Sequence, residues 1–310
     1  MSKVLVTGGA GFIGSHMVGH LVAGGHTVRV LDNLCSGKQE NLSSMKAKIE
    51  FIKGDIRNKQ DVDRAMQGIE KVAHFAALRS VPESMADPQG YTETNVLGTV
   101  QLLEAAVSAK VQRFVFVSSC SVYGEIEQPF RENQAPQPIS IYAANKWVGE
   151  EMSTQFSRGF GLSTVSLRFF NVFGPRQSLE DEYAVVVPKF ITSILNQKSP
   201  PIYGDGKQSR DFIYVGDVVQ AVEAALTAEG LTGEVFNVGA GQAHTVLELL
   251  ETINQILGAQ IKPTFENARP GDILHASGSI EKVKQQLQWQ PSIGFEEGLK
   301  QTVQYFKEHL

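Results

Sequence analysis

The chain has 310 residues, 42% of them hydrophobic, so it can bury a large core and form one large domain or two. Its formal net charge of −5 argues against a basic surface for nucleic acid or for an anionic membrane. Cys35 and Cys120 lack neighbours at metal-ligand spacing. The sequence shows no basic segment followed by an apolar one, as a signal peptide would have. No apolar run reaches the roughly 18–20 residues of a membrane span. We therefore expect a reduced cytoplasmic protein without a metal ion.

In the first half of the chain, short apolar runs alternate with segments of helical periodicity. The apolar runs are rich in Val, Ile and Phe on both faces, which is typical of the buried strands of a parallel sheet. Repeated β-α-β units then predict a doubly wound, Rossmann-type α/β fold with right-handed crossovers. The predicted strands are Val4–Val6, Val28–Leu31, Phe51–Lys53, Val72–Phe75, Phe114–Val117 and Thr164–Arg168, and the predicted helices are Phe12–Ala23, Asp61–Met66, Val96–Ser108 and Ala143–Arg158.

The second half of the chain is less regular, and Gly and Pro pairs punctuate it. One helix is well marked there, because Thr245 and Glu248 form a capping box at its start. We assign residues 1–170 to the doubly wound domain and residues 171–310 to a smaller α/β lobe that binds the substrate. A strand near 235–239 is expected to return to the main sheet, so that the two lobes interleave in sequence.

A glycine-rich loop directly follows the first predicted strand and opens the first predicted helix. A glycine triplet alone is a weak signal, but in this context the backbone amides offer an anion site for the pyrophosphate of a dinucleotide. Asp32 ends the second strand, where a carboxylate accepts hydrogen bonds from the adenosine ribose and repels a 2′-phosphate. This favours NAD over NADP, although Arg29 argues the other way. The loop residues expected at the cofactor are Gly8, Gly11, Phe12, Ile13 and Gly14.

Tyr142 and Lys146 stand four residues apart, which places both side chains on one face of a helix. A free phenol has a pKa near 10, so proton transfer near neutral pH needs a shift of about 3 units, which a lysine ammonium and a nicotinamide cation can supply. Ser119 follows the fifth predicted strand, at the edge where doubly wound sheets bind ligands. A tyrosinate beside a nicotinamide can remove a hydroxyl proton while hydride leaves the same carbon. The three residues therefore predict a redox enzyme that oxidises an alcohol.

Taken together, these motifs resemble the extended short-chain dehydrogenase/reductase family, and within it the nucleotide-sugar 4-epimerases. The sequence departs from the family pattern at Asn145, where serine, threonine or alanine is more usual, and at Ser277-Gly278-Ser279, where relatives often carry an aspartate. The resemblance runs nearly from end to end and rests on Thr7-Gly8-x-x-Gly11-x-x-Gly14, Asp32-Asn33, Gly54-Asp55, His74-Phe75-Ala76-Ala77, Asn95-Val96-Leu97-Gly98-Thr99, Ser119, Tyr142-x-x-x-Lys146 and Arg168-Phe169-Phe170-Asn171-Val172-Phe173-Gly174-Pro175-Arg176.

The resemblance implies NAD as the cofactor and a UDP-sugar as the substrate. Tyr142 would be the general base, Lys146 would bond the nicotinamide ribose, and Ser119 would bond the substrate oxygen. The planar guanidinium group of an arginine can donate two hydrogen bonds to the diphosphate, and an aromatic ring can stack on the uracil. Family members usually form homodimers through helices at about 96–108 and 143–158. The further residues implied are Asn33, Asp55, Ile56, Ala76, Ala77 and Asn95 at the cofactor, and Asn171, Val187, Tyr203, Arg210, Arg269, Asp272 and Ala276 at the substrate.

Four classes of function stay open at this stage. Relatives that perform 4,6-dehydration carry Asp-Glu directly after the catalytic Ser or Thr, and decarboxylases usually keep the glutamate, whereas this chain has Cys120-Ser121. The intact Ser119, Tyr142 and Lys146 argue against a non-catalytic NAD sensor. We therefore expect a 4-epimerase of UDP-glucose and UDP-galactose, and the small Ala276 predicts that UDP-N-acetylhexosamines are accepted too. UDP-glucuronate is the rival substrate.

Overall fold

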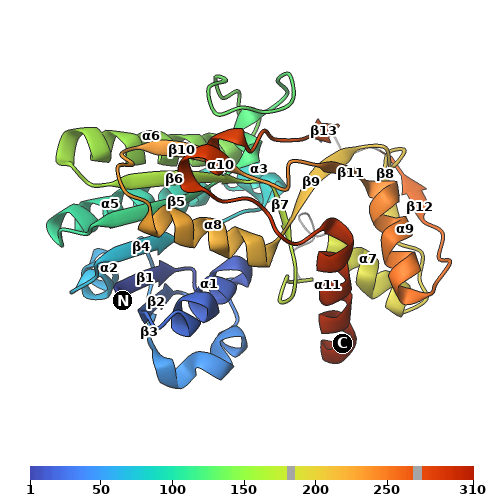
Figure 1. Ribbon diagram of the computed structural model, residues 1–310, viewed down its shortest axis with the longest axis horizontal. Helices are drawn as coiled ribbons and strands as arrows, with labels where there is room; N and C mark the ends of the chain where they lie inside the picture. Colours follow the sequence, from blue (N-terminus) through green and yellow to red (C-terminus); the bar gives the residue numbers. More distant parts are fainter. Residues whose placement is uncertain (180–185, 268–273) are drawn as a thin grey trace.

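A computed structural model describes residues 1–179, 186–267 and 274–310 of the chain. Its centre is a seven-stranded parallel sheet in the order β10-β6-β5-β4-β1-β2-β3 (Figure 1). This order confirms the doubly wound fold that the sequence predicts. The strands are β1 (Lys3–Thr7), β2 (Thr27–Asp32), β3 (Ile49–Lys53), β4 (Lys71–His74), β5 (Arg113–Ser119), β6 (Thr164–Phe169) and β10 (Glu234–Val238).

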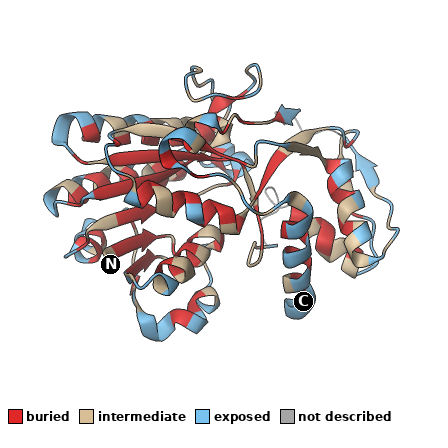
Figure 2. Ribbon diagram, viewed as in Figure 1, coloured by how far each residue is buried: buried red, intermediate tan, exposed pale blue. Residues whose placement is uncertain are grey.

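Helices cover both faces of this sheet, so its inner strands are largely buried, whereas the edge strand β3 is partly exposed (Figure 2). Alternate residues of a strand point to opposite faces, and β1 accordingly sends Val4 and Val6 to one core and Leu5 to the other. Helices α1, α8 and α10 pack into the first core, and α2, α5 and α6 into the second. Their bounds are α1 (Phe12–Ala23), α2 (Lys59–Met66), α5 (Gly98–Ser108), α6 (Ile141–Phe160), α8 (Val215–Thr227) and α10 (Glu281–Leu287).

The helix predicted from Val96 begins differently in the structure. A π-helical turn, η2 (Glu93–Leu97), runs directly into α5, where one regular helix from Val96 was expected. π-Helical turns occur often at functional sites because the extra residue re-aims neighbouring side chains. The remaining short helices of the first lobe are η1 (Gln39–Lys48), α3 (Val81–Ala86), α4 (Pro88–Thr92) and η3 (Cys120–Tyr123).

The smaller lobe has two small sheets and its own apolar core. Strand β9 lies at the centre of one sheet and pairs with β7, β11 and β13, and β8 pairs with β12. Three helices close the core, and the capping box of Thr245 and Glu248 at the start of α9 is confirmed. The bounds are β7 (Asn171–Phe173), β8 (Pro201–Tyr203), β9 (Ser209–Tyr214), β11 (Ala243–Thr245), β12 (Thr264–Glu266), β13 (His275–Ala276), α7 (Val186–Leu195), α9 (Val246–Leu257) and α11 (Phe295–His309).

The second half of the chain also contributes to the large sheet. Strand β10 lies beside β6, and α8 and α10 supply Val218, Val222 and Val283 to the core on the α1 face. The proposed boundary at residue 170 therefore does not separate two independently packed units. It remains a proposal that the residues before it bind the cofactor and the residues after it bind the substrate. Among the described residues, no helix combines the length and the apolar character needed to cross a membrane.

Candidate active site

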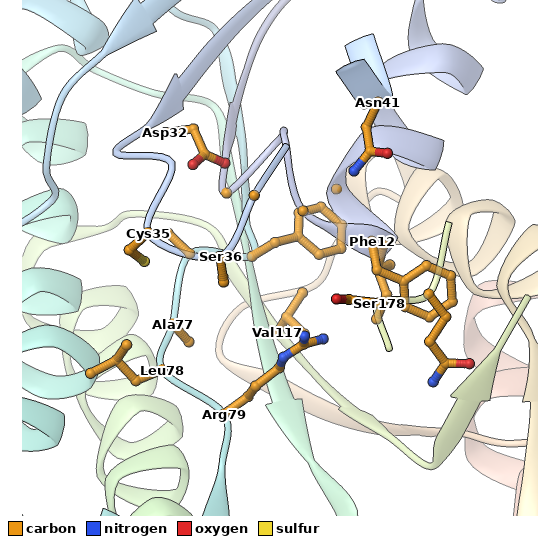
Figure 3. A pocket seen from close by; sticks show the side chains of 18 of the residues that line it. Phe12, Asp32, Cys35, Ser36, Asn41, Ala77, Leu78, Arg79, Val117 and Ser178 are labelled. Atoms are coloured by element: carbon orange, nitrogen blue, oxygen red, sulfur yellow. The ribbon is translucent and has the colours of Figure 1, made fainter. Parts of the chain in front are cut away.

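A cavity of about 610 Å³ opens at the carboxyl ends of the parallel strands. In the strand order, β2 and β4 lie on opposite sides of β1, so the chain winds in opposite directions from this point. Ligands of doubly wound folds bind at such a reversal. The cavity wall, part of which is shown in Figure 3, includes the predicted substrate residue Asn171 and most of the predicted cofactor and catalytic residues: Gly8, Gly11, Phe12, Ile13, Gly14, Asp32, Asn33, Asp55, Ile56, Ala76, Ala77, Ser119, Tyr142 and Lys146.

The glycine loop is shaped as a cradle for a diphosphate. Gly8 has a φ of +68°, and a Cβ added there would lie 2.7 Å from the backbone nitrogen of Ala76. A Cβ at Gly14 would lie 2.2 Å from the carbonyl oxygen of Gly8. Gly11 begins α1 without a side-chain cap, so the first amides of the helix face the cavity rather than a capping side chain. These features fit the pyrophosphate of NAD.

Asp32 occupies the position expected for the contact to the adenosine ribose. Its carboxylate is 7% exposed and accepts hydrogen bonds from the amides of Ala10 at 2.9 Å and Leu34 at 2.8 Å. Burial raises the pKa of this carboxyl, and the two amide bonds oppose that effect. A carboxylate can accept about four hydrogen bonds, so capacity remains for a ribose hydroxyl.

Arg29 does not compete with this assignment. Its guanidinium donates to the carbonyl oxygens of Ala65 at 2.9 Å and Gln67 at 2.7 Å, and it pairs with Glu50 at 2.8 Å. The side chain is buried against α2 and does not line the cavity. The sequence-based doubt about a 2′-phosphate contact from Arg29 is therefore removed.

Asp55 is already bonded on two sides. Arg57 donates to it from Nε at 3.0 Å and from Nη2 at 2.7 Å, and Asn33 donates at 2.9 Å. The hydrogen bond from Arg57 is the main reason that the pKa of Asp55 lies well below its usual range. Asp55 thus orders its own loop and also lines the cavity, and its contact with the cofactor stays a prediction.

Asn95 acts on the cofactor wall through the backbone. Its side-chain oxygen accepts from the amide of Leu78, and its nitrogen donates to the carbonyl oxygen of Leu78, both at 2.8 Å. The π-helical turn η2 aims Asn95 at the loop after β4, and its neighbour Thr94 lines the cavity. Asn95 therefore holds the strand-end loop that carries Ala76 and Ala77.

The predicted catalytic residues meet at the junction of β5 and α6. Tyr142 and Lys146 lie on the first turns of α6, which Ser140 caps at its N-terminus. Ser119 ends β5, and its hydroxyl forms a hydrogen bond with the phenol of Tyr142. The ammonium of Lys146 lies 5.9 Å from the centre of the Tyr142 ring and donates to the carbonyl oxygen of Val117 at 2.8 Å. Lys146 thus supports the phenol from a short distance rather than bonding to it.

The electrostatics of this site differ from the sequence-based expectation. Burial raises the pKa of Tyr142 to about 12, and the hydrogen bond to Ser119 and the charge of Arg79 oppose that rise. Burial also lowers the pKa of Lys146 to about 8, which the charge of Glu150 opposes. Desolvation outweighs the opposing effects of Ser119 and Arg79 on the pKa of Tyr142, so the protein's own residues do not bring Tyr142 into the neutral range. The positive nicotinamide of bound NAD⁺ would supply further stabilisation of the tyrosinate.

The small β7–β9–β13 sheet gathers three of the predicted substrate residues. Asn171 lies opposite Phe212 on β9, and Ala276 lies opposite Arg210. Asn171 lines the cavity, and Arg210 donates to the carbonyl oxygens of its own neighbours Ser209 and Leu274. Ala276 is 4% exposed and packs beside Phe170, which is itself part of the cavity wall.

The other predicted substrate residues lie apart from this cavity or outside the described residues. Tyr203 ends β8, next to β12. Val187 is 2% exposed and lies in the core of the smaller lobe. Arg269 and Asp272 fall outside the residues that the structure describes. The assignment of these residues to the substrate therefore stays a prediction.

The cavity wall also includes residues to which the sequence assigned no role. Arg79 points into the cavity from the loop after β4 (Figure 3), and its charge acts on Tyr142. Arg176 has a φ of +64° and donates to the hydroxyl of Ser15 at 3.1 Å, which joins the smaller lobe to α1. Arg79 lies just after one of the family motifs, and Arg176 is the last residue of another. The directions in which their side chains point depend on the paths of loops, which hydrophobic periodicity does not predict. In the described part of the chain, no cluster of three His, Cys, Asp or Glu side chains could hold a metal ion.

Comparisons with known proteins agree with this geometry. Residues 4–239 match the model of the NAD dependent epimerase/dehydratase family. The chain is 38% identical over 310 residues to a putative UDP-glucose 4-epimerase of Methanocaldococcus jannaschii, with 99% of each chain covered. Relatives named as decarboxylases and dehydratases also match. The chain therefore belongs to the NAD-dependent epimerase/dehydratase family, and NAD is its cofactor.

Solved structures of similar proteins match along nearly the whole chain. It is similar to the UDP-N-acetylglucosamine 4-epimerase of Methanobrevibacter ruminantium in complex with UDP-N-acetylmuramic acid, with a TM-score of 0.96, 39% identity, and 100% and 99% of the two chains covered. It is also similar to the UDP-glucose 4-epimerase of Thermus thermophilus in complex with NAD, with a TM-score of 0.91, 39% identity, and 99% and 100% covered.

Proposed function

We propose that this protein is an NAD-dependent 4-epimerase of UDP-hexoses, acting on UDP-glucose and UDP-galactose and on the UDP-N-acetylhexosamines. The observation that carries the proposal is the meeting of Ser119, Tyr142 and Lys146 in one cavity with the glycine cradle. The similarity to named UDP-glucose and UDP-N-acetylglucosamine 4-epimerases along the whole chain supports the substrate class.

The proposed roles of the chain's own residues follow from their positions. Ser119 bonds O4 of the sugar and orients it, and Tyr142 removes the O4 proton and later returns it. Lys146 holds the nicotinamide ribose and contributes positive charge near the phenol. When bound in the glycine cradle, NAD⁺ would supply reversible hydride transfer at C4, so that the 4-keto sugar would regain hydride on its opposite face and no net oxidation would remain. The proton and hydride are thus both restored, and the sole change is the configuration at C4.

The residues beside Ser119 support epimerisation over dehydration. Loss of water from C5 and C6 requires an additional acid and base, and a carboxylate pair is suited to that work. Here the two positions after Ser119 are Cys120 and Ser121, and the Ser121 hydroxyl donates to the Ser119 oxygen at 3.0 Å. Burial raises the pKa of Cys120 to about 12, so its thiol stays protonated. Neither side chain can act as the missing carboxylate.

The protein is further proposed to work as a cytoplasmic homodimer that binds neither nucleic acid nor membrane. The two cysteines are free, which suits a reducing compartment. The helices expected at the dimer contact, α5 and α6, pack side by side, and large apolar side chains at their ends are more than half exposed, namely Leu97 at 60% and Phe160 at 65%. Burial of such side chains against a second copy is favourable.

One experiment separates the candidate reactions by their products. The purified protein is incubated with UDP-glucose, UDP-N-acetylglucosamine and UDP-glucuronate, without added NADH, and the nucleotide sugars are resolved by chromatography and NMR. The proposal expects UDP-galactose and UDP-N-acetylgalactosamine. A 4-keto-6-deoxy sugar would indicate a dehydratase, a pentose would indicate a decarboxylase, and unchanged sugars would indicate a binding protein. Conversion of UDP-glucuronate alone would move the substrate to the uronic acids.

A further inference from the structure

Glu150 extends the row of catalytic side chains on α6 by one helical turn. Tyr142, Lys146 and Glu150 stand at intervals of four residues and therefore share one face of the helix. The same face lies against the carboxyl end of β5. There, Val117 accepts from Lys146 at 2.8 Å, and the hydroxyl of Ser118 donates to Glu150. The turn of α6 beyond the reacting groups is thus tied to the strand that ends in the catalytic serine.

Arg168 of β6 engages both oxygens of Glu150. Nε lies 2.9 Å from Oε1 and Nη2 lies 2.7 Å from Oε2, and Arg168 stands opposite Ser118 in the strand register. The exposed fractions are 3% for Arg168 and 2% for Glu150, so the pair is fully withdrawn from water. The guanidinium also lies 4.6 Å from the centre of the Tyr123 ring. A packed apolar pair commonly stabilises a fold as well as a buried ion pair does, so stability alone is a weak reason for these residues.

Three elements, α6, β4 and β6, place titratable or charged groups around Lys146. On α6 they are Tyr142 and Glu150, and on β4 the facing group is His74, whose pKa burial lowers to about 3, so it stays neutral. On β6 the guanidinium of Arg168 reaches this region through Glu150. Burial lowers the pKa of Lys146 to about 8, and the carboxylate of Glu150 is the charge that resists this fall.

We propose that Glu150 is a positioning residue of this site: its carboxylate, held by Arg168 and Ser118, keeps the ammonium of Lys146 charged and in place beside Tyr142. Arg168 and Ser118 bond the carboxylate of Glu150, whereas the ammonium of Lys146 donates to the Val117 carbonyl, so Glu150 acts on Lys146 through its charge and through the shared contact with β5. The consequence for turnover rests on the proposed epimerase function, whereas the consequence for the charge of Lys146 concerns the protein itself.

The direct test measures the ionisation of Lys146 by NMR in protein labelled with ¹³C at lysine Cε. The resonance is assigned by its loss in Lys146→Met. Glu150→Gln keeps the shape of the side chain and removes its charge, and it should lower the pKa of Lys146 by about one unit or more, because an opposite charge nearby is lost. An unchanged Lys146 titration in Glu150→Gln would overturn the proposal.

Two further variants separate charge from structural support. Glu150→Met combined with Arg168→Met replaces the ion pair by a packed apolar pair, and thermal unfolding should return toward the wild-type temperature while the pKa of Lys146 stays low. Recovery of the wild-type Lys146 pKa in this double variant would contradict the proposal. The matched control Glu151→Gln neutralises an exposed glutamate on the same helix, and the pKa of Lys146 should stay close to the wild-type value.

The same variants have a readable effect on turnover. As the pH rises, Lys146 loses its proton and the activity that depends on its charge falls. In Glu150→Gln this fall should begin at a lower pH than in wild type, because the pKa of Lys146 is lower. A loss of activity that is uniform across pH would assign Glu150 a structural role only and would count against the proposal. A wild-type protein without activity on any UDP-sugar would refute the proposed function, and the NMR titration would still decide the role of Glu150.

Discussion

The ammonium nitrogen of Lys146 lies 2.8 Å from the carbonyl oxygen of Val117 and donates a hydrogen bond to it. This contact holds the lysine at the end of β5, two residues before the catalytic Ser119. An ammonium group has three donors, so the contact leaves others for the hydroxyl groups of a bound ribose.

Replacement of Tyr142 by phenylalanine should remove proton transfer and preserve binding. The expected loss in turnover is about 10²–10⁴-fold or more, because a positioned general base contributes on that scale. NAD content and UDP-sugar affinity should stay near the wild-type values, since the ring remains in place. Steady-state kinetics together with calorimetric titration measure both quantities. The matched control is Tyr91→Phe, a buried tyrosine outside the cavity wall that should retain turnover. Near-normal turnover in Tyr142→Phe would rule out the mechanism.

NAD should bind more tightly than NADP. The Asp32 carboxylate is fixed by the amides of Ala10 and Leu34, so it meets the ribose hydroxyls and faces a 2′-phosphate with like charge. Titration of cofactor-free protein with each dinucleotide tests this preference. Arg29→Lys should leave the ratio of the two affinities unchanged, because Arg29 is bound to backbone carbonyls near α2. Equal or tighter binding of NADP would overturn the assignment of Asp32.

The parts of the fold and site that the sequence predicts are those encoded by local pattern. Strands buried on both faces, such as Val4–Val6, fit only the interior of a sheet covered on both sides, and the glycine loop needs residues without a Cβ at Gly8 and Gly14. The capping box of α9 is likewise a local signal. Arg79 escaped prediction because its role depends on where a loop after β4 meets α6, which is a tertiary relationship.

The charge state of the catalytic pair could not be predicted for a related reason. The spacing of Tyr142 and Lys146 indicates that they are neighbours, but their pKa values depend on burial, which only the packed structure shows. The same holds for Val187, which has the sequence context of a ligand contact and lies in the core of the smaller lobe. Desolvation and packing are properties of the whole chain.

Stability should fall as the pH decreases below about 6.5, and His74 should account for part of this fall. His74 is 2% exposed, and burial lowers its pKa to about 3. Its Nε2 lies 3.0 Å from the hydroxyl of Thr99, and its Nδ1 lies 2.7 Å from the hydroxyl of Thr7, so both ring nitrogens are satisfied in the neutral form.

The sign follows from proton linkage. Above pH 6.5 the imidazole is neutral in both folded and unfolded chains, and below it only the unfolded chain binds the proton until the pH approaches 3. The free energy of unfolding should therefore decrease between these values, by a few kcal/mol at about pH 4. Urea unfolding at several pH values measures the slope. His74→Gln should flatten it, and the control His309→Gln, at an exposed histidine of α11, should not. An equal slope in His74→Gln and wild type would contradict the assignment.

Ala276→Tyr should reduce activity on UDP-N-acetylglucosamine far more than activity on UDP-glucose. In the family that the chain resembles, the side chain at this position lies beside the sugar, and a tyrosine excludes a 2-acetamido group. Here Ala276 belongs to the same buried cluster as Phe170, which lines the cavity, so the larger ring of a tyrosine is expected to shift this part of the cavity wall. Initial rates on both sugars provide the measurement, and thermal unfolding of the variant shows whether the core tolerates the larger ring. Ala276→Ser adds one oxygen atom and should keep both activities. Equal losses on the two sugars, or no wild-type activity on the acetylated sugar, would show that Ala276 does not control substrate range.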